Sequence, residues 1–206
     1  MFLPNESSVI ILAAGNSGRM GFPKAFLSWD GKFTFLEKSI QTYRRFGCKE
    51  IVVVLNPQVL DFYRTNNYTF LSGVNVVINS HPEWERYYSI KTGLSALENM
   101  KACYIQDVDN PFTKKTILTN LLQNLPVAGY SFPDYDEQGG HPLLISERII
   151  RHIVHTKDNE RNLREVLIQF DMKAVITNDP SVLYNINTPE DYERLIEGMP
   201  HEETVE

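Results

Sequence analysis

A short apolar segment that runs directly into a glycine-rich, basic loop is the feature that most constrains how this chain folds. Residues 9–12 read VIIL, an unbroken β-branched and aliphatic run, and small residues follow it. Such a run is typical of a strand buried on both faces of a parallel sheet. The loop that follows has glycines at positions 15, 18 and 21. We therefore expect a central parallel strand that ends in a ligand-binding loop.

The loop has the composition of a phosphate-binding cradle. Glycine lets other atoms approach the backbone closely, so the N–H groups near Gly15 and Gly18 can face an anion. Arg19 and Lys24 add fixed positive charge. Open α/β sheets bind their ligands at the carboxyl ends of the strands, where this loop begins. The alternative is a plain strand-to-helix turn that carries solvated charges.

Counting the residues of the loop disfavours two better-known nucleotide-binding motifs. A dinucleotide-binding loop has the spacing GxGxxG, whereas Gly18 here comes three residues after Gly15. A P-loop has Lys and then Ser or Thr directly after its last glycine, whereas Phe22 follows Gly21 and Lys24 comes later. Hydride transfer on a dinucleotide loop and Walker-type hydrolysis therefore lose support.

Composition and charge narrow the class of protein further. The chain has 206 residues, 42% hydrophobic and 22% charged, as expected for one globular domain over residues 1–206 with a frayed tail at 201–206. Its net charge of −6 disfavours a nucleic-acid partner, and no apolar run is long enough to cross a membrane. The two cysteines, Cys48 and Cys103, form no CxxC pair. We expect buried thiols in a reducing, cytoplasmic compartment.

Apolar periodicity predicts alternating strands and helices along the chain. The expected strands cover residues 9–12, 51–55, 74–78, 102–105, 126–132, 141–145, 175–176 and 183–186. The expected helices cover residues 36–46, 57–64, 85–100, 113–122, 146–154, 161–170 and 188–196. Residues 25–29 are expected to be extended, and residues 134–140 to form a polar loop. This order favours an α/β fold, a three-layer α/β/α sandwich around a Rossmann-like, mostly parallel sheet.

Acidic and amide residues follow the expected strand at residues 102–105, on the same edge of the sheet as the glycine-rich loop. Asp107 and Asp109 are followed by Asn110 and Pro111. A carboxylate such as Asp109 can hold Mg²⁺ there, opposite the cations of the loop. The alternative is an Asx-type turn that stops the strand, because Asp, Asn and Pro favour turns for local reasons.

A third polar group comprises Asn185 and Asn187. Thr188 and Pro189, which follow them, predict the start of a helix through capping alone. Capping does not explain two amides placed two residues apart. On an extended strand these amides point the same way, so their carbonyl oxygens can serve as ligands of a hard cation.

These motifs, in this order, resemble the MobA-like nucleotidyltransferases. The matching segments are LAAGNSGRMGFPK, QDVDNP, GGHPLL and NINTPEDYERL, within residues 9–196. The resemblance implies a fold of the nucleotide-diphospho-sugar transferase type. It also implies transfer of a nucleoside monophosphate from a nucleoside triphosphate to a phosphorylated small-molecule acceptor, with Mg²⁺ and release of pyrophosphate. The segment GGHP and Ala14 resemble most closely the cytidylyltransferases that act on the molybdenum cofactor, which implies CTP as the donor.

The resemblance also implies roles for individual residues. Catalysis is implied for Arg19, Lys24 and Asp109, and metal binding for Asp109 and Asn187. Nucleotide binding is implied for Leu12, Ala13, Ala14, Gly15, Arg19, Lys24, Asn79 and Ser89. Acceptor binding is implied for Arg86, Tyr87 and His141. The chain departs from the family pattern at Asn187, which resembles the guanylyl enzymes, and in the two tyrosines of the segment EWERYYSI.

Structural alternatives stay open for several of these residues. His141 either contacts the acceptor phosphate or is a turn histidine that packs near Pro142. Asp107 either orients water or a second metal, or stabilises a turn. Trp84 and Tyr87 either pack in the core or stack on a flat ring.

Two rival functions also stay open. One is a sugar-phosphate or polyol-phosphate nucleotidyltransferase on the same fold. The other is a non-catalytic nucleotide-binding sensor. The joint presence of Arg19, Lys24, Asp109 and Asn187 favours catalysis, because an inert binder does not need both cations and both candidate metal ligands. No protein partner is indicated.

Overall fold

The apolar run at residues 9–12 lies at the centre of a sheet, as its composition predicts. It belongs to strand β1 (Ser7–Ala13), in which every residue is buried. Val9 and Ile11 pack into one core cluster, and Ile10 and Leu12 into the other, on the opposite face of the sheet. The computed structural model describes residues 2–69 and 71–198, so the tail expected at residues 201–206 lies outside the described residues.

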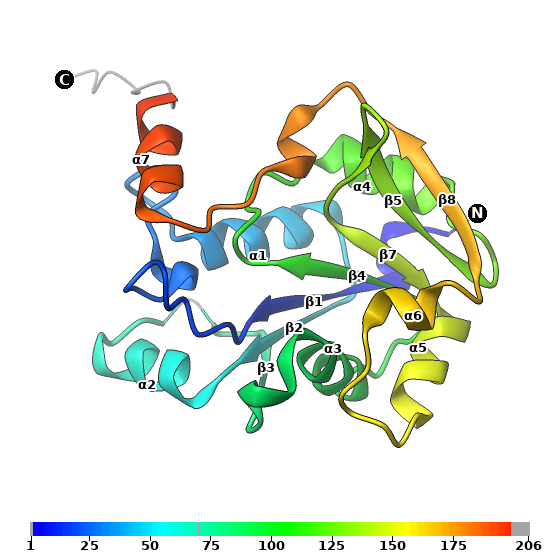
Figure 1. Ribbon diagram of the computed structural model, residues 1–206, viewed down its shortest axis with the longest axis horizontal. Helices are drawn as coiled ribbons and strands as arrows, with labels where there is room; N and C mark the ends of the chain where they lie inside the picture. The colour runs from blue at the N-terminus through cyan, green and yellow to red at the C-terminus, as the bar shows by residue number, and fades with distance from the viewer. Residues whose placement is uncertain (1, 70, 199–206) are drawn as a thin grey trace.

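Among the described residues, eight strands form a single sheet in the order β3-β2-β1-β4-β7-β5-β6, with β8 beside β5 (Figure 1). After β1 the strands are β2 (Glu50–Leu55), β3 (Asn75–Ile78), β4 (Ala102–Asp107), β5 (Gly129–Tyr135), β6 (Gln138–Gly139), β7 (Leu143–Ser146) and β8 (Asp171–Ile176). The first four strands are parallel to one another. β7 is antiparallel to both β4 and β5, and β8 is parallel to β5. The prediction of a mostly parallel sheet is confirmed.

Helices cover both faces of the sheet and complete the three layers (Figure 1). They are α1 (Phe35–Phe46), α2 (Pro57–Thr65), α3 (Glu85–Ser95), α4 (Lys115–Gln123), α5 (Glu147–His155), α6 (Leu163–Leu167) and α7 (Pro189–Gly198). Residues of α1 and α4 belong to one core cluster, and residues of α3, α5 and α6 to the other. No helix within residues 2–69 and 71–198 has the length and apolar composition needed to span a bilayer.

Local capping explains where the first two long helices begin. The Thr34 hydroxyl accepts the N–H of Glu37, whose carboxylate accepts the N–H of Thr34 in return, and Gly47 ends α1 with a φ of 99°. Asn56 caps α2 by accepting the N–H of Val59, and its side-chain amide also donates to the carbonyl oxygen of Ala14 at 2.9 Å. Asn56 therefore ties the start of the glycine-rich loop to the neighbouring strand–helix connection.

Helix α3 is shorter than the expected 85–100, because the chain after Ser95 is held by the sheet instead. The Glu50 carboxylate accepts the N–H groups of Glu98 and Asn99. The Asn99 side chain donates in turn to the carbonyl oxygen of Glu6. These bonds hold residues 98 and 99 against the amino ends of β1 and β2. Helix α6 is likewise shorter than the expected 161–170.

The polar loop expected at residues 134–140 is a hairpin. Asp134 pairs with Gly139 and Tyr135 with Gln138, so that β6 extends the sheet beyond β5. Asp136 and Glu137 connect the two strands with φ angles of 51° and 61°. Two positive φ angles in a two-residue connection match the twist of a hairpin. This turn lacks the glycine by which such a hairpin is usually recognised in a sequence.

The strand expected at residues 183–186 is not present. Pro180–Leu183 is a 3₁₀ helix, and the chain after it is irregular. Side-chain and turn contacts replace the ladder, because the Asn110 amide donates to the carbonyl oxygens of Ser181 and Tyr184. The extended piece expected at residues 25–29 also differs, since Lys24–Phe26 is a 3₁₀ helix.

Candidate active site

A pocket of about 320 Å³ opens at the carboxyl ends of β1 and β4. Because β1 and β4 are parallel, the glycine-rich loop after β1 and the acidic turn after β4 lie at the same edge of the sheet, as expected from the sequence. Its walls contain most of the residues selected from the sequence: Leu12, Ala13, Ala14, Gly15, Arg19, Lys24, Arg86, Ser89, Asp109 and Asn187. The fold therefore gathers residues from both ends of the chain around one cavity.

The glycine-rich loop forms an open wall of this pocket. A turn shapes it, since the N–H groups of Met20 and Gly21 both donate to the carbonyl oxygen of Ser17. A Cβ atom added at Gly15 or Gly18 would meet no atom within 4 Å, and neither residue has a positive φ. Protein packing therefore does not require these glycines, and their bare backbone leaves room for a ligand to approach closely.

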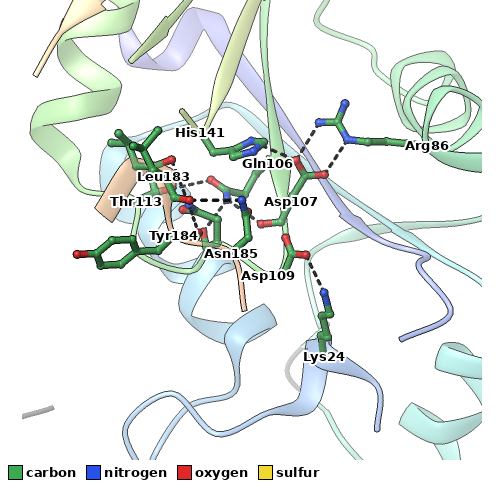
Figure 2. A network of polar contacts seen from close by, with 12 residues as sticks. Lys24, Arg86, Gln106, Asp107, Asp109, Thr113, His141, Leu183, Tyr184 and Asn185 are labelled. Carbon is green, nitrogen blue, oxygen red and sulfur yellow. Dashed lines mark hydrogen bonds and ion pairs between the residues drawn. The ribbon is translucent and has the colours of Figure 1, made fainter. Parts of the chain in front are cut away.

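Lys24 joins the two candidate metal ligands. Its Nζ lies 2.9 Å from Oδ2 of Asp109 and donates to Oδ1 of Asn187 at 2.7 Å. Figure 2 shows the Lys24 side chain reaching up to Asp109. The side chains of Lys24 and Asp109 are only 14% and 23% exposed, so the contact is shielded from much of the solvent. One carboxylate oxygen and one amide oxygen thus converge on a single cation.

This pair of oxygens fits Mg²⁺. Mg²⁺ takes oxygen ligands and is commonly held by one or two protein groups together with substrate phosphates. The ammonium of Lys24 already marks a point that both oxygens reach. Within residues 2–69 and 71–198, no group of three or more His, Cys, Asp or Glu side chains could hold a metal. A metal held by Asp109 and Asn187 would take its other ligands from water or from substrate phosphates.

Asn187 reaches the site through contacts of the turn after β4. The N–H of Ile186 donates to the carbonyl oxygen of Asp109 at 2.9 Å. On the other side, the Asp191 carboxylate accepts the N–H groups of Asn187 and Thr188, and these backbone bonds lower the pKa of Asp191. The amide of Asn187 is therefore fixed between the β4 turn and the first turn of α7.

Asp107 lies beside the metal ligands but has other partners. Nε and Nη2 of Arg86 donate to its two carboxylate oxygens at 3.0 and 2.8 Å, and Nδ1 of His141 lies 3.2 Å from Oδ2 (Figure 2). Burial on its own raises the pKa of Asp107, but the charge and hydrogen bonds of Arg86 outweigh it and lower the pKa. Asp107 is therefore an ionised partner of Arg86 and His141.

Gln106 holds the turn that carries both carboxylates, a role that the sequence did not reveal. It is fully buried, and its side-chain oxygen accepts the hydroxyls of Tyr43 and Thr113 at 2.8 and 2.7 Å. Its side-chain nitrogen donates to the carbonyl oxygens of Asp107 and Asn110, both at 2.8 Å. The signal available in the sequence was a polar residue, Gln106, at the end of an apolar strand. That signal does not identify the partners of its side chain.

Three of the selected residues lie outside the walls of this pocket. Asn79 is fully buried, and its amide donates to the hydroxyl of Ser89 at 2.8 Å, so it supports Ser89 from behind. His141 contacts Asp107. Tyr87 lies in the wall of a second pocket of about 540 Å³, which shares Glu85 and Arg86 with the first. No sequence motif pointed to Glu85.

The fold of this chain is shared with solved nucleotidyltransferase structures. A solved structure titled as a nucleotidyl transferase from Methanothermobacter thermautotroptrophicus aligns with a TM-score of 0.74 and 21% identity, over 93% of this chain and 96% of that one. The sequence matches the MobA-like NTP transferase domain over residues 9–174, and the chain belongs to this family. The fold class and the family predicted from the motifs are confirmed.

The curated relatives include enzymes for two different nucleotides. The molybdenum cofactor cytidylyltransferase of Escherichia coli K12 is 27% identical over 187 residues, covering 89% of this chain and 92% of that protein. A probable molybdenum cofactor guanylyltransferase of Clostridium perfringens SM101 is also 27% identical, covering 93% and 96%. The chain is thus a nucleotidyltransferase related to both kinds of molybdenum cofactor enzyme.

Proposed function

We propose that this chain transfers CMP from CTP to the molybdenum cofactor, a phosphorylated acceptor, with Mg²⁺ and release of pyrophosphate. The observation that carries the reaction type is the meeting of Lys24, Asp109 and Asn187 beside an open glycine-rich loop. The choice of CTP and of the acceptor is supported by similarity to the Escherichia coli cytidylyltransferase. Ala14 and the segment GGHP at residues 139–142 favour the same choice.

The proposed reaction is a displacement at the α-phosphorus of the triphosphate. An oxygen of the acceptor phosphate attacks and forms the new P–O bond. The bond from the α-phosphorus to the oxygen that bridges to the β-phosphate breaks, and pyrophosphate leaves with that electron pair. The attacking phosphate oxygen is already ionised at neutral pH, so no side chain has to remove a proton.

The main task of the protein is to bring two anions together. Arg19 is exposed in the pocket wall, and with the loop backbone it would bind the triphosphate. Lys24 would offset the negative charge that collects on the departing pyrophosphate. Mg²⁺ held by Asp109 and Asn187 would supply Lewis-acid stabilisation of the phosphate charge when bound.

The proposal is tested by measuring pyrophosphate release with each of the four nucleoside triphosphates, with and without the molybdenum cofactor, and with sugar and polyol phosphates as other acceptors. We expect release that requires CTP, the molybdenum cofactor and Mg²⁺. Turnover with GTP alone would contradict the choice of nucleotide, and turnover with a polyol phosphate alone would contradict the choice of acceptor. Binding of CTP without turnover on any acceptor would favour the sensor.

An Asp109→Ala variant tests the metal site directly. We expect loss of turnover on the order of 10²-fold or more, because the variant removes the charged ligand. The matched control is Asp61→Ala, which removes an exposed carboxylate on α2, outside the pocket. Equal rates in the two variants would remove Asp109 from the proposed metal site.

A further inference from the structure

The ammonium of Lys24 lies where the candidate metal site needs a cation. Its Nζ is 2.9 Å from Oδ2 of Asp109 and donates to Oδ1 of Asn187 at 2.7 Å; Figure 2 shows the contact with Asp109. These two side chains are also the candidate ligands of Mg²⁺. Because both oxygens already bind an ammonium, a divalent cation that uses them has to displace it. In the free protein Lys24 therefore competes with the metal.

The charges around Asp109 favour one cation at a time. Lys24 balances the single negative charge of Asp109, and their side chains are only 14% and 23% exposed, so water screens the two charges less than it would at the surface. The neighbouring carboxylate, Asp107, is bound by Arg86 and contacts His141. A divalent cation beside the ammonium would thus meet repulsion that the one charge of Asp109 does not offset.

The backbone of Lys24 is fixed, whereas its side chain has the freedom to leave the two oxygens. Lys24 opens a 3₁₀ helix whose next residues, Ala25 and Phe26, are 2% and 5% exposed. A lysine carries its charge on a flexible stem of four carbons and has three N–H donors. Asp109 and Asn187 accept two of these donors. The third remains for a phosphate oxygen, so the ammonium can contact a triphosphate before it leaves the two oxygens.

The glycine-rich loop connects Lys24 to the place proposed for the triphosphate. The N–H of Lys24 donates to Oγ of Ser17 at 3.3 Å, and the carbonyl oxygen of Ser17 accepts the N–H groups of Met20 and Gly21. Ser17, Arg19 and Lys24 all contribute to the wall of the first pocket. An anion held by the loop thus lies in the same pocket as the ammonium and can draw it away from the two oxygens.

We infer that Lys24 closes the metal site of the free protein and opens it when a triphosphate binds. The phosphate oxygens take over the ammonium, which leaves Asp109 and Asn187 available to a divalent cation. The free chain therefore binds metal weakly, and nucleotide and metal bind together. This inference rests on the proposed function, because it orders the binding events at the same site, but no part of it needs the acceptor.

Binding of Mn²⁺ alone, followed by electron paramagnetic resonance, tests the closed state. Lys24→Met removes the ammonium and keeps a long, unbranched side chain. We expect this variant to bind Mn²⁺ about tenfold or more tightly than the wild type does, because the repulsion of the ammonium is gone. Asp109→Ala in the Lys24→Met background should lose that gain. Lys49→Met, the matched control at an exposed lysine, should bind Mn²⁺ as the wild type does.

Binding of CTP in the presence of EDTA, measured by equilibrium dialysis, tests where the ammonium goes. Without metal the triphosphate depends on the cations of the pocket, so Lys24→Met should weaken CTP binding about tenfold. The variant should thus gain affinity for the metal and lose affinity for the nucleotide. Damage to the fold would weaken both, and the urea midpoint of the variant measures such damage. Lys24→Arg, which retains the charge, should bind Mn²⁺ as weakly as the wild type does.

Three outcomes would overturn the inference. Equal Mn²⁺ affinity in the wild type and in Lys24→Met would show that the ammonium does not keep the metal out. A gain that survives Asp109→Ala would place the new metal site elsewhere, and an equal gain in Lys24→Arg would exclude charge as the cause. If both binding arms behave as expected but the wild type transfers no nucleotide to any acceptor, the proposed function fails while this inference stands.

Discussion

The ammonium of Lys24 contacts one side-chain oxygen of each of the two proposed metal ligands, Asp109 and Asn187. We predict that Lys24→Ala lowers turnover on the order of 10²-fold. In the transition state negative charge collects on the departing pyrophosphate, and the variant removes the cation proposed to offset it. Steady-state pyrophosphate release measures this. The comparison variant is Lys49→Ala, which removes an exposed lysine next to the amino end of β2.

Removing Lys24 also leaves Asp109 and Asn187 without their shared cation. Unchanged kcat in Lys24→Ala, with kcat equally unchanged in Lys49→Ala, would show that the ammonium takes no part in the transition state. A fall in both variants would indicate an effect of net charge instead of a local contact.

A Gly18→Ala variant should weaken nucleotide binding without changing the stability of the fold. An added Cβ at this position meets no protein atom within 4 Å, so Gly18→Ala should leave the free energy of unfolding within about 0.5 kcal/mol of wild type. The methyl group would instead stand where the triphosphate approaches the backbone. We expect KM for CTP to rise on the order of tenfold, measured beside a urea titration. A normal KM would mean that nothing approaches the loop at that point.

The residues at the centre of the candidate site could be predicted from the sequence, but the buried amides that hold them in place could not. Lys24, Asp109 and Asn187 were all selected from motifs, and the structure brings them within hydrogen-bond distance. The motifs did not show that Gln106 and Asn110 hold this arrangement, because their partners are backbone carbonyls and side chains far away in sequence. Amide side chains have no sequence pattern that names such partners.

At the scale of elements, the contact between α3 and the central strands depends on one small residue. A Cβ at Gly93 would lie 2.8 Å from Cγ2 of Val54 and 3.1 Å from Cγ2 of Ile10. Gly93→Ala should therefore push α3 away from β1 and β2 and lower the free energy of unfolding by about 1–3 kcal/mol. Urea unfolding followed by circular dichroism measures the change.

The matched control for Gly93→Ala is Gly198→Ala, a glycine-to-alanine change in another helix. Gly198 is the last residue of α7, and an added Cβ there meets nothing within 4 Å. Alanine has the higher helix propensity, so the control should be neutral or slightly stabilising. Equal unfolding midpoints for the two variants would contradict the close packing of α3.

Elements with strong apolar patterns were predicted, and those made by turns and side-chain contacts were not. β1, β2 and α1 follow their apolar runs and caps closely. The hairpin of β5 and β6 was missed because Asp136 and Glu137 have positive φ angles without glycine. Residues 183–186 have the apolar and aromatic composition of a short strand, but the Asn110 side chain holds that segment outside the sheet.

At the scale of the whole molecule, two shielded thiols predict how stability responds to alkaline pH. Cys103 is buried, as expected from the sequence, whereas Cys48 is only partly buried. Burial raises the pKa of Cys48 to about 12, against an ordinary value of 9.0, and raises the pKa of Cys103 as well. A thiol whose pKa is raised by folding stabilises the native state below its unfolded pKa. That contribution is lost as the pH rises from 9 towards 12, by about 1.4 kcal/mol per pH unit for one group.

The free energy of unfolding should therefore fall between pH 9 and 11, and fall less steeply in Cys48→Ala. Urea titrations at a series of pH values provide the slopes. The buried hydroxyls of Tyr43 and Tyr104 add to the slope in both proteins, since burial raises their pKa values too, so only the difference reports on Cys48. Identical slopes would show that Cys48 ionises as freely in the folded chain as in the unfolded one.

The contact between Lys24 and Asn187 joins two residues that are 163 positions apart. The segment before Asn187 has no strand ladder. It is held by hydrogen bonds of the Asn110 amide and of the Ile186 N–H, and by the buried side chains of Val182 and Ile186. Such a segment can open at a free energy below that of global unfolding. Loss of activity should therefore report the opening of this segment before the whole chain unfolds. In mild denaturant, turnover should fall while the circular dichroism spectrum stays native.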